Sequence, residues 1–162
     1  MPTRANEARM MDDMGTFGTE VEIENPAKPG ARRTFANALV DTGAELSWFP
    51  RAVLEELGVE RVKRWHFRQA DGTVLARWTG AVRLGVGEVW TVDEVVFGEP
   101  GDLVLLGARS LEGLNLRVEP MTKRLVDAGP APAGGSASGL TAVGYGQRNR
   151  LAARLRTAMT SS

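Results

Sequence analysis

The residues most able to do chemistry lie in Leu-Val-Asp-Thr-Gly-Ala, residues 39–44 of the 162-residue chain. Asp41 directly follows an aliphatic pair and directly precedes Thr42 and Gly43. An ionised carboxylate at the end of an apolar strand is costly to desolvate unless partners compensate for the lost water. Something in the folded protein must therefore stabilise Asp41, and the elements around it have to bring that partner close.

Short strands are predicted before and after this stretch. Residues 17–24 alternate apolar and polar side chains, which is the period of a strand with one solvated face. Residues 34–40 form a second strand that ends at Asp41, because glycine in Thr42-Gly43 tolerates backbone angles that break a strand. A short helix is expected from Pro50 to Gly58.

A hairpin is the clearest feature of the following residues. Its turn is predicted at Ala70, Asp71 and Gly72, between two strands. The other expected elements are a strand over 88–97, a buried strand over 103–107, a short helix over 108–114 and a hairpin over 115–126 about Pro120. Many short strands with few helices predict an all-β fold, either a small barrel or a sandwich.

Length and composition predict one domain and exclude several classes of protein. A chain of this size with 43% hydrophobic residues holds one core. We expect a flexible N-terminus at 1–14, a folded domain at 15–127, and a Gly/Pro/Ala/Ser linker with a basic tail at 128–162. The pattern of the tail favours a solvated or disordered segment over an amphipathic helix. A net charge of zero argues against nucleic acid as a partner, and the absence of cysteine excludes disulfides and thiol nucleophiles.

The polar start of the chain lacks the apolar segment of a signal peptide, so a cytoplasmic location is expected. No membrane association is expected either, although the four arginines of the tail leave it as a weak possibility.

The order of these motifs resembles that of the retropepsin-like aspartic proteases, a single-domain family that includes retroviral proteases and small bacterial relatives. The specific part of the likeness is Asp41-Thr42-Gly43-Ala44 after an apolar strand, together with the aliphatic run into glycine at Leu105-Leu106-Gly107. The likeness covers about residues 15–127. It implies a small closed β-barrel with one or two short helices that acts as a homodimer on peptide or protein substrates.

The resemblance also implies a role for each matching residue. Asp41 would be the catalytic carboxylate, with Thr42, Gly43 and Ala44 forming the active-site loop. The hydroxyl of Thr42 would tie the two loops of the dimer together. The tip of a flap over the substrate would consist of Ala70, Asp71 and Gly72, and the loop behind the site of Leu106 and Gly107.

A pair of aspartates accounts for the position of Asp41. Two carboxylates about 3 Å apart cannot both stay ionised, so they share one proton. The ionised member deprotonates a water while the protonated member donates to the scissile carbonyl, which makes an aspartic endopeptidase that needs no metal and no other cofactor. The alternative is a dimeric barrel with weak or no activity that binds peptides or a protein partner.

Some residues depart from the family pattern or compete with it. Ala108 stands where retroviral members carry arginine, with Arg109 next, and Glu45 is expected to face water. Leu-Val-Asp-Ala-Gly at 125–129 repeats part of the motif, but we interpret it as coincidence because a linker follows. His66, the only histidine, is expected to be a plain strand residue. The aromatic residues Trp48, Trp65, Phe67 and Trp78 are equally compatible with a substrate pocket and with core packing.

Overall fold

The structure is a computed structural model, and it describes residues 16–134. The chain divides into two units, residues 1–129 and 130–162, and the elements below belong to the first. The predicted flexible segment at 1–14 lies outside the described residues, as does the tail from residue 135 onward. The predictions for those segments remain untested.

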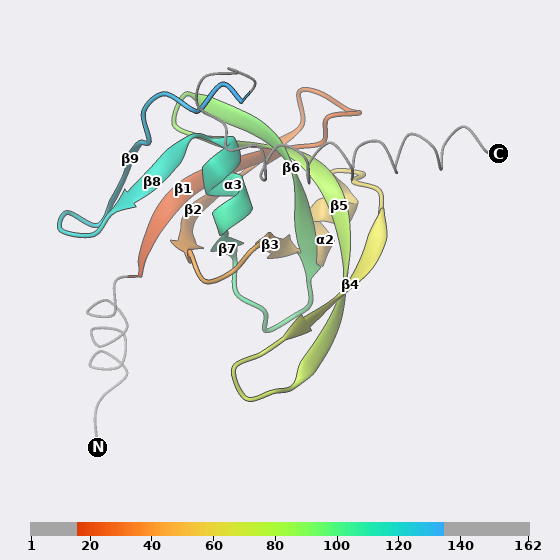
Figure 1. Ribbon diagram of the computed structural model, residues 1–162. Helices are drawn as coiled ribbons and strands as arrows, with labels where there is room; N and C mark the ends of the chain where they lie inside the picture. Colours follow the sequence, from red (N-terminus) through yellow and green to blue (C-terminus); the bar gives the residue numbers. More distant parts are fainter. Residues whose placement is uncertain (1–15, 135–162) are drawn as a thin grey trace. The chain divides into compact units, whose positions relative to one another are not determined.

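The described residues form mostly β-strands (Figure 1). The nine strands are β1 (Phe17–Glu24), β2 (Arg32–Val40), β3 (Ser47–Pro50), β4 (Lys63–Arg68), β5 (Val74–Val86), β6 (Val89–Gly98), β7 (Leu105–Leu106), β8 (Leu116–Glu119) and β9 (Arg124–Asp127). Two short helices, α2 (Arg51–Glu56) and α3 (Ala108–Gly113), accompany them. The predicted β-rich architecture with one or two short helices is therefore confirmed.

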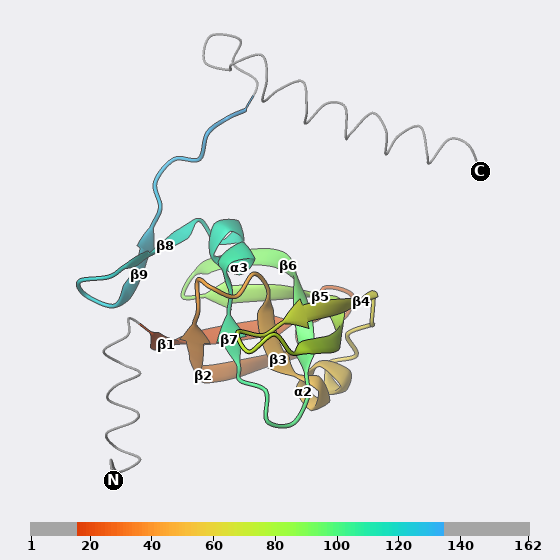
Figure 2. The same ribbon diagram turned by 60° about the horizontal axis from the view of Figure 1, so that its bottom comes forward.

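Seven strands pair in the order β1-β2-β7-β3-β6-β5-β4, and β1 also pairs with β5 over three residues. Six strands of this order, from β1 to β5, thus form a series whose two end strands also pair with each other. Strand β4 follows β5 as the second arm of the β4–β5 hairpin (Figure 2). Strand β2 runs parallel to β7, and β3 runs parallel to β6. Strands β8 and β9 form a separate two-stranded sheet.

The core is built by the alternation that the sequence shows in β1. Val21 and Ile23 are fully buried on one face of this strand, whereas Glu20 is exposed on the other. Phe49 of β3 and Phe97 of β6 are the largest side chains in the same cluster. Each fully buried side chain of this kind stabilises the folded state by about 1.5–3 kcal/mol.

A buried carboxylate lies beside the β1–β5 pairing. Glu24, 2% exposed, accepts a hydrogen bond from the backbone N–H of Gly30 and one from Nη1 of Arg83 at 3.0 Å. The Gly30 N–H, together with the charges of Arg32 and Arg83, holds the pKa of Glu24 below its usual value despite burial. These partners thus offset the cost of desolvating the Glu24 carboxylate at the end of β1.

Helix α2 begins and ends as its sequence predicts. Pro50 is its N-cap, and Gly58 has a positive φ of 75° just after its last turn. The N–H groups of Gly58 and Val59 donate to the carbonyls of Glu55 and Leu54, which is the Schellman pattern of helix termination. Neither α2 nor α3 is long and apolar enough to cross a membrane, and residues 16–134 contain no other helix.

Two elements differ from the sequence prediction. Strand β3 was not expected, because Pro50 indicated only a helix start. The buried strand predicted over 103–107 is reduced to the two residues of β7, and Leu103 is 60% exposed, so among the apolar side chains of this run only Leu106 is fully buried in the core. The predicted hairpin at 70–72 is confirmed by β4 and β5, which pair from Lys63–Thr79 to Arg68–Val74.

Candidate active site

The loop after β2 holds Asp41 in a defined orientation. The backbone N–H of Asp41 donates to the carbonyl of Leu106 at 3.0 Å, which ties the end of β2 to β7. Its carboxylate Oδ1 accepts the N–H of Gly43 at 2.9 Å, and its carbonyl accepts the N–H of Ala44 at 3.2 Å. Asp41 is half-buried, while Thr42 and Gly43 are exposed. The tight turn therefore presents the carboxylate at the surface of the fold.

The segment 106–109, which runs from the end of β7 into α3, supports this loop from behind. The N–H groups of Ala108 and Arg109 donate to the carbonyls of Ala44 and Glu45 at 2.8 and 3.0 Å. Gly107 lies so close to this backbone that a Cβ there would come within 2.5 Å of the Leu46 carbonyl oxygen. Leu106 and Gly107 thus lie directly against the Asp41 loop.

A buried serine pair connects the two loops and was not singled out from the sequence. Ser47 Oγ accepts the N–H of Gly107 at 2.9 Å and lies 2.5 Å from Ser110 Oγ. Ser110 Oγ in turn donates to Oδ2 of Asp93 at 2.8 Å, and both serines are fully buried. A serine in an apolar segment carries no sequence signal for such a network, because its partners are about 60 residues away along the chain.

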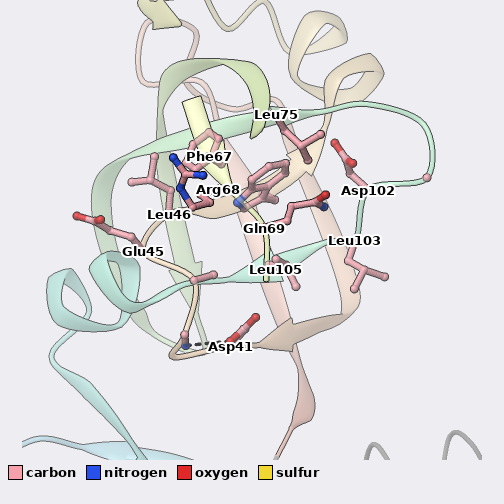
Figure 3. A pocket seen from close by; sticks show the side chains of 14 residues that line it. Asp41, Glu45, Leu46, Phe67, Arg68, Gln69, Leu75, Asp102, Leu103 and Leu105 are labelled. Atoms are coloured by element: carbon pink, nitrogen blue, oxygen red, sulfur yellow. Dashed lines mark hydrogen bonds between the residues drawn. The ribbon is translucent and has the colours of Figure 1, made fainter. Parts of the chain in front are cut away.

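Asp41 borders a pocket of about 450 Å³ (Figure 3). The Asp41 loop and β3 form one part of its lining, and the end of β4, the start of β5, the loop before β7 and β7 itself form the rest. The lining residues are Asp41, Gly43, Ala44, Glu45, Leu46, Trp48, Phe67, Arg68, Gln69, Leu75, Gly101, Asp102, Leu103 and Leu105. A volume of this size holds one large side chain together with the adjoining peptide backbone.

The β4–β5 hairpin contributes the residues just before and after its turn to the pocket, but not the turn itself. Phe67, Arg68 and Gln69 line the pocket across from Asp41 (Figure 3), whereas Ala70, Asp71 and Gly72 do not. The tip is a tight turn in which Gly72 has a φ of 88°. There the N–H of Thr73 donates to Oδ1 of Asp71, which lowers the pKa of this aspartate.

The aromatic residues separate into two groups. The rings of Trp48 and Phe67 lie 5.0 Å apart and line the pocket, and Trp65 stacks on Phe67 at 5.8 Å. Trp78 is 38% exposed on the other face of the hairpin, where the guanidinium of Arg64 lies over its ring. The sequence alone did not separate these groups, because it does not show which face of the sheet each of these side chains occupies.

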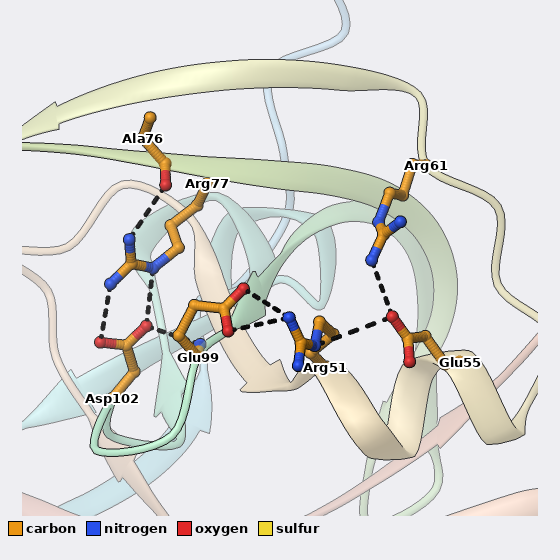
Figure 4. Close-up of polar contacts among 7 residues, drawn as sticks. All are labelled: Arg51, Glu55, Arg61, Ala76, Arg77, Glu99 and Asp102. Carbon is orange, nitrogen blue, oxygen red and sulfur yellow. Dashed lines mark hydrogen bonds and ion pairs between the residues drawn. The ribbon is translucent and has the colours of Figure 1, made fainter.

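An ion pair at the edge of the pocket joins the hairpin to the loop before β7 (Figure 4). Arg77 of β5 donates from Nε and Nη2 to the two carboxylate oxygens of Asp102 at 2.8 and 3.2 Å. The Arg77 hydrogen bonds and the N–H of Glu99 hold the pKa of Asp102 below its usual value. Nothing in the sequence pairs these two residues, so this contact was not predicted.

The residues that depart from the family pattern have ordinary surroundings. The Arg109 guanidinium lies 3.7 Å from Glu94, and Ala108 contributes only its backbone to the loop contact. Glu45 is exposed, as expected. The Thr42 hydroxyl makes no hydrogen bond within residues 16–134. His66 is an exposed residue of β4.

The second aspartate motif lies elsewhere in the fold. Asp127 ends β9, and its Oδ1 accepts the N–H of Gly129 at 2.6 Å, the same local contact that Asp41 makes with Gly43. Asp127 does not line the pocket. The repeated motif thus reproduces this one hydrogen bond but not the backbone of the Asp41 loop, since Gly129 has a φ of 83° and Gly43 has no positive φ.

Comparison with known proteins agrees with this arrangement. A search of curated proteins found no match. A model of the family described as gag-polyprotein putative aspartyl protease matches residues 32–113, about half of the chain. The matched range contains β2, the Asp41 loop, the hairpin and the Gly107 loop. The chain therefore belongs to this family of retropepsin-like aspartyl proteases.

Proposed function

We propose that this chain is an aspartic endopeptidase whose active unit is a homodimer of small barrels, with Asp41 of each subunit forming the catalytic pair. The observation that carries the proposal is the position of Asp41, held by Gly43 and Leu106 at the border of a pocket that the hairpin covers from the other side. The family of the chain supports proteolysis in general, and the pocket supports a peptide as substrate.

The proposed reaction is hydrolysis without a covalent intermediate. The ionised aspartate accepts a proton from water, and the water oxygen forms a bond to the scissile carbonyl carbon. The protonated aspartate of the pair donates its proton to the carbonyl oxygen. The tetrahedral diol then collapses, the C–N bond breaks, and the nitrogen leaves as an amine with a proton returned by the pair. One Asp41 supplies only one of the two catalytic carboxyl groups, because a single carboxylate cannot serve as acid and base in the same step.

The test compares two aspartates that each accept the N–H of a glycine two residues later. The full chain and the variants Asp41→Asn and Asp127→Asn are incubated with a mixed peptide library at mildly acidic to neutral pH, and products are identified by mass spectrometry. Cleavage is expected from the unmodified chain and from Asp127→Asn. Asp41→Asn should lose at least about a hundredfold in rate, the usual contribution of a general acid or base.

Light scattering on the same samples separates the proposal from its alternative. A dimer in all three proteins, with cleavage lost only in Asp41→Asn, supports the proposed enzyme. Peptide binding without cleavage by the unmodified chain supports a binding module instead. Cleavage that survives in Asp41→Asn contradicts the assignment of the catalytic residue.

A further inference from the structure

Arg68 differs from most arginines of the described residues because it has no carboxylate partner. Ion pairs are formed by Arg32, Arg33, Arg51, Arg61, Arg77, Arg83, Arg109 and Arg117. Within residues 16–134, the side chain of Arg68 makes one hydrogen bond, from Nη1 to the Gly72 carbonyl at 3.4 Å. That distance lies beyond the usual range for such bonds, so the guanidinium remains available to a ligand.

The position of Arg68 places this cation at the pocket. It is the last residue of β4 and lines the pocket together with Phe67 and Gln69 (Figure 3). The carboxylates nearby are already engaged or turned away. Asp102 is paired with Arg77, and Oδ1 of Asp71 accepts the Thr73 N–H.

The other acids of the lining are Asp41, whose Oδ1 accepts the Gly43 N–H, and Glu45. The exposed carboxylate of Glu45 is directed away from the other labelled residues in Figure 3. Arg68 is therefore the cation at the pocket without a partner of its own.

Strand geometry determines what a bound peptide would present to Arg68. Successive side chains of a strand point to opposite faces, so Phe67 packs on Trp48 while Arg68 is exposed on the other face. In the described part of the chain β4 pairs only with β5, which leaves its second edge free. An extended peptide along that edge alternates in the same way. A residue beside Phe67 faces the apolar lining, and its neighbour faces Arg68.

We propose that the preferred substrates carry an aspartate or glutamate directly next to a large apolar residue, and that Arg68 determines this specificity. The apolar residue contacts the side of the pocket formed by Trp48, Phe67 and Leu75. The acidic residue pairs with the Arg68 guanidinium, whose fork of donors matches a carboxylate. This inference rests on the proposed peptidase function but concerns only the choice of substrate.

The test uses sets of peptides that differ at one position. Each peptide has a phenylalanine or leucine with Glu, Gln or Lys as its neighbour, on either side. For the unmodified chain, kcat/KM for the Glu peptide should exceed that for the Gln peptide by about threefold to fivefold, the effect of an exposed ion pair. Added salt should reduce the difference, because salt screens exposed charges. Arg68→Gln should remove the preference, and Arg68→Glu should transfer it to the Lys peptide.

Arg64→Gln is the matched control. Arg64 lies on the same strand and, like Arg68, has no carboxylate partner in the described residues, but it does not line the pocket. The preference should persist in this variant. Equal cleavage of the three peptides by the unmodified chain, or a preference that survives in Arg68→Gln, would overturn the inference.

A binding measurement keeps the two proposals distinguishable. The same peptides, labelled for fluorescence anisotropy, are titrated with Asp41→Asn and with the double variant that also carries Arg68→Gln. If no peptide is cleaved by the unmodified chain, the peptidase proposal fails, yet tighter binding of the Glu peptide that depends on Arg68 still supports the recognition. Equal affinities, or no binding of any peptide, contradict it.

Discussion

Gly107 shows how a single residue fixes the distance between the two loops of the site. A Cβ at this position would lie 2.5 Å from the Leu46 carbonyl oxygen and 2.9 Å from that of Ala44. Both neighbours are backbone atoms, so they cannot turn away as a flexible side chain would. We expect Gly107→Ala to lower the free energy of unfolding by about 1–3 kcal/mol, the usual cost of overpacking, and to reduce cleavage further by displacing Asp41.

Gly98→Ala is the graded comparison for this prediction. Its Cβ would also face a backbone oxygen, that of Phe49, but at 3.1 Å. Chemical denaturation should rank the unmodified chain first, Gly98→Ala second and Gly107→Ala last. An unchanged unfolding free energy in Gly107→Ala would show that the two loops are not in rigid contact.

At the scale of elements, the Arg77–Asp102 pair links the β4–β5 hairpin to the loop before β7. Both side chains are mostly shielded, with 16% and 18% exposure. We expect Asp102→Asn to lower the free energy of unfolding by about 1–3 kcal/mol, as for other hydrogen bonds to charged groups. Hydrogen exchange should become faster in the loop and around Arg77 in the hairpin, since both lose the hydrogen bonds that join them.

The pH dependence of this linkage has a definite sign. Because the pKa of Asp102 is lowered in the folded protein, the stabilisation is complete above the ordinary value of 3.8. This stabilisation is lost as the pH falls through the lowered pKa that Asp102 has in the folded protein. The stability difference between the unmodified chain and Asp102→Asn should therefore close at strongly acidic pH.

Arg51→Gln is the control, since Arg51 pairs with Glu99 of the same loop at 3.1 Å but is 44% exposed (Figure 4). Exposed pairs contribute about 0–1 kcal/mol, so this variant should change little. Equal effects of the two substitutions would argue against a linking role for Asp102.

The sequence predicted the elements whose signals are local. Alternation in β1, the glycine after α2 and the Ala70-Asp71-Gly72 turn all act within a few residues, and each is found where it was expected. The Asp41 loop was located by its Asp-Thr-Gly-Ala motif, and part of its structure is equally local, since Asp41 accepts the N–H groups of Gly43 and Ala44.

Contacts between distant segments were missed. Strand β3 has only four residues, and it exists through parallel pairing with β6. The Ser47–Ser110 and Arg77–Asp102 contacts join segments that no sequence period relates. The sequence also did not show which hairpin residues line the pocket, because only the tertiary structure shows which faces of β4 and β5 are turned toward it.

At the scale of the whole molecule, the proposed mechanism requires two chains for each active site. One described chain places one Asp41 at its pocket, and the Thr42 hydroxyl beside it is exposed. If the catalytic pair forms between subunits, a wild-type chain paired with an Asp41→Asn chain is inactive. Mixing the unmodified chain with increasing Asp41→Asn, after time for subunit exchange, should therefore reduce cleavage per wild-type chain in proportion to the wild-type fraction.

The Asp127→Asn chain is the control for this titration, because it keeps Asp41 and changes an exposed aspartate outside the pocket. Adding it should leave activity per total chain constant, since every pairing retains two catalytic carboxylates. Dilution of the unmodified chain provides an independent check, because a dimeric enzyme loses specific activity once its subunits separate. If activity per wild-type chain instead stays constant in the presence of excess Asp41→Asn, each subunit acts alone, and a carboxylate of the same chain must serve as the second catalytic group.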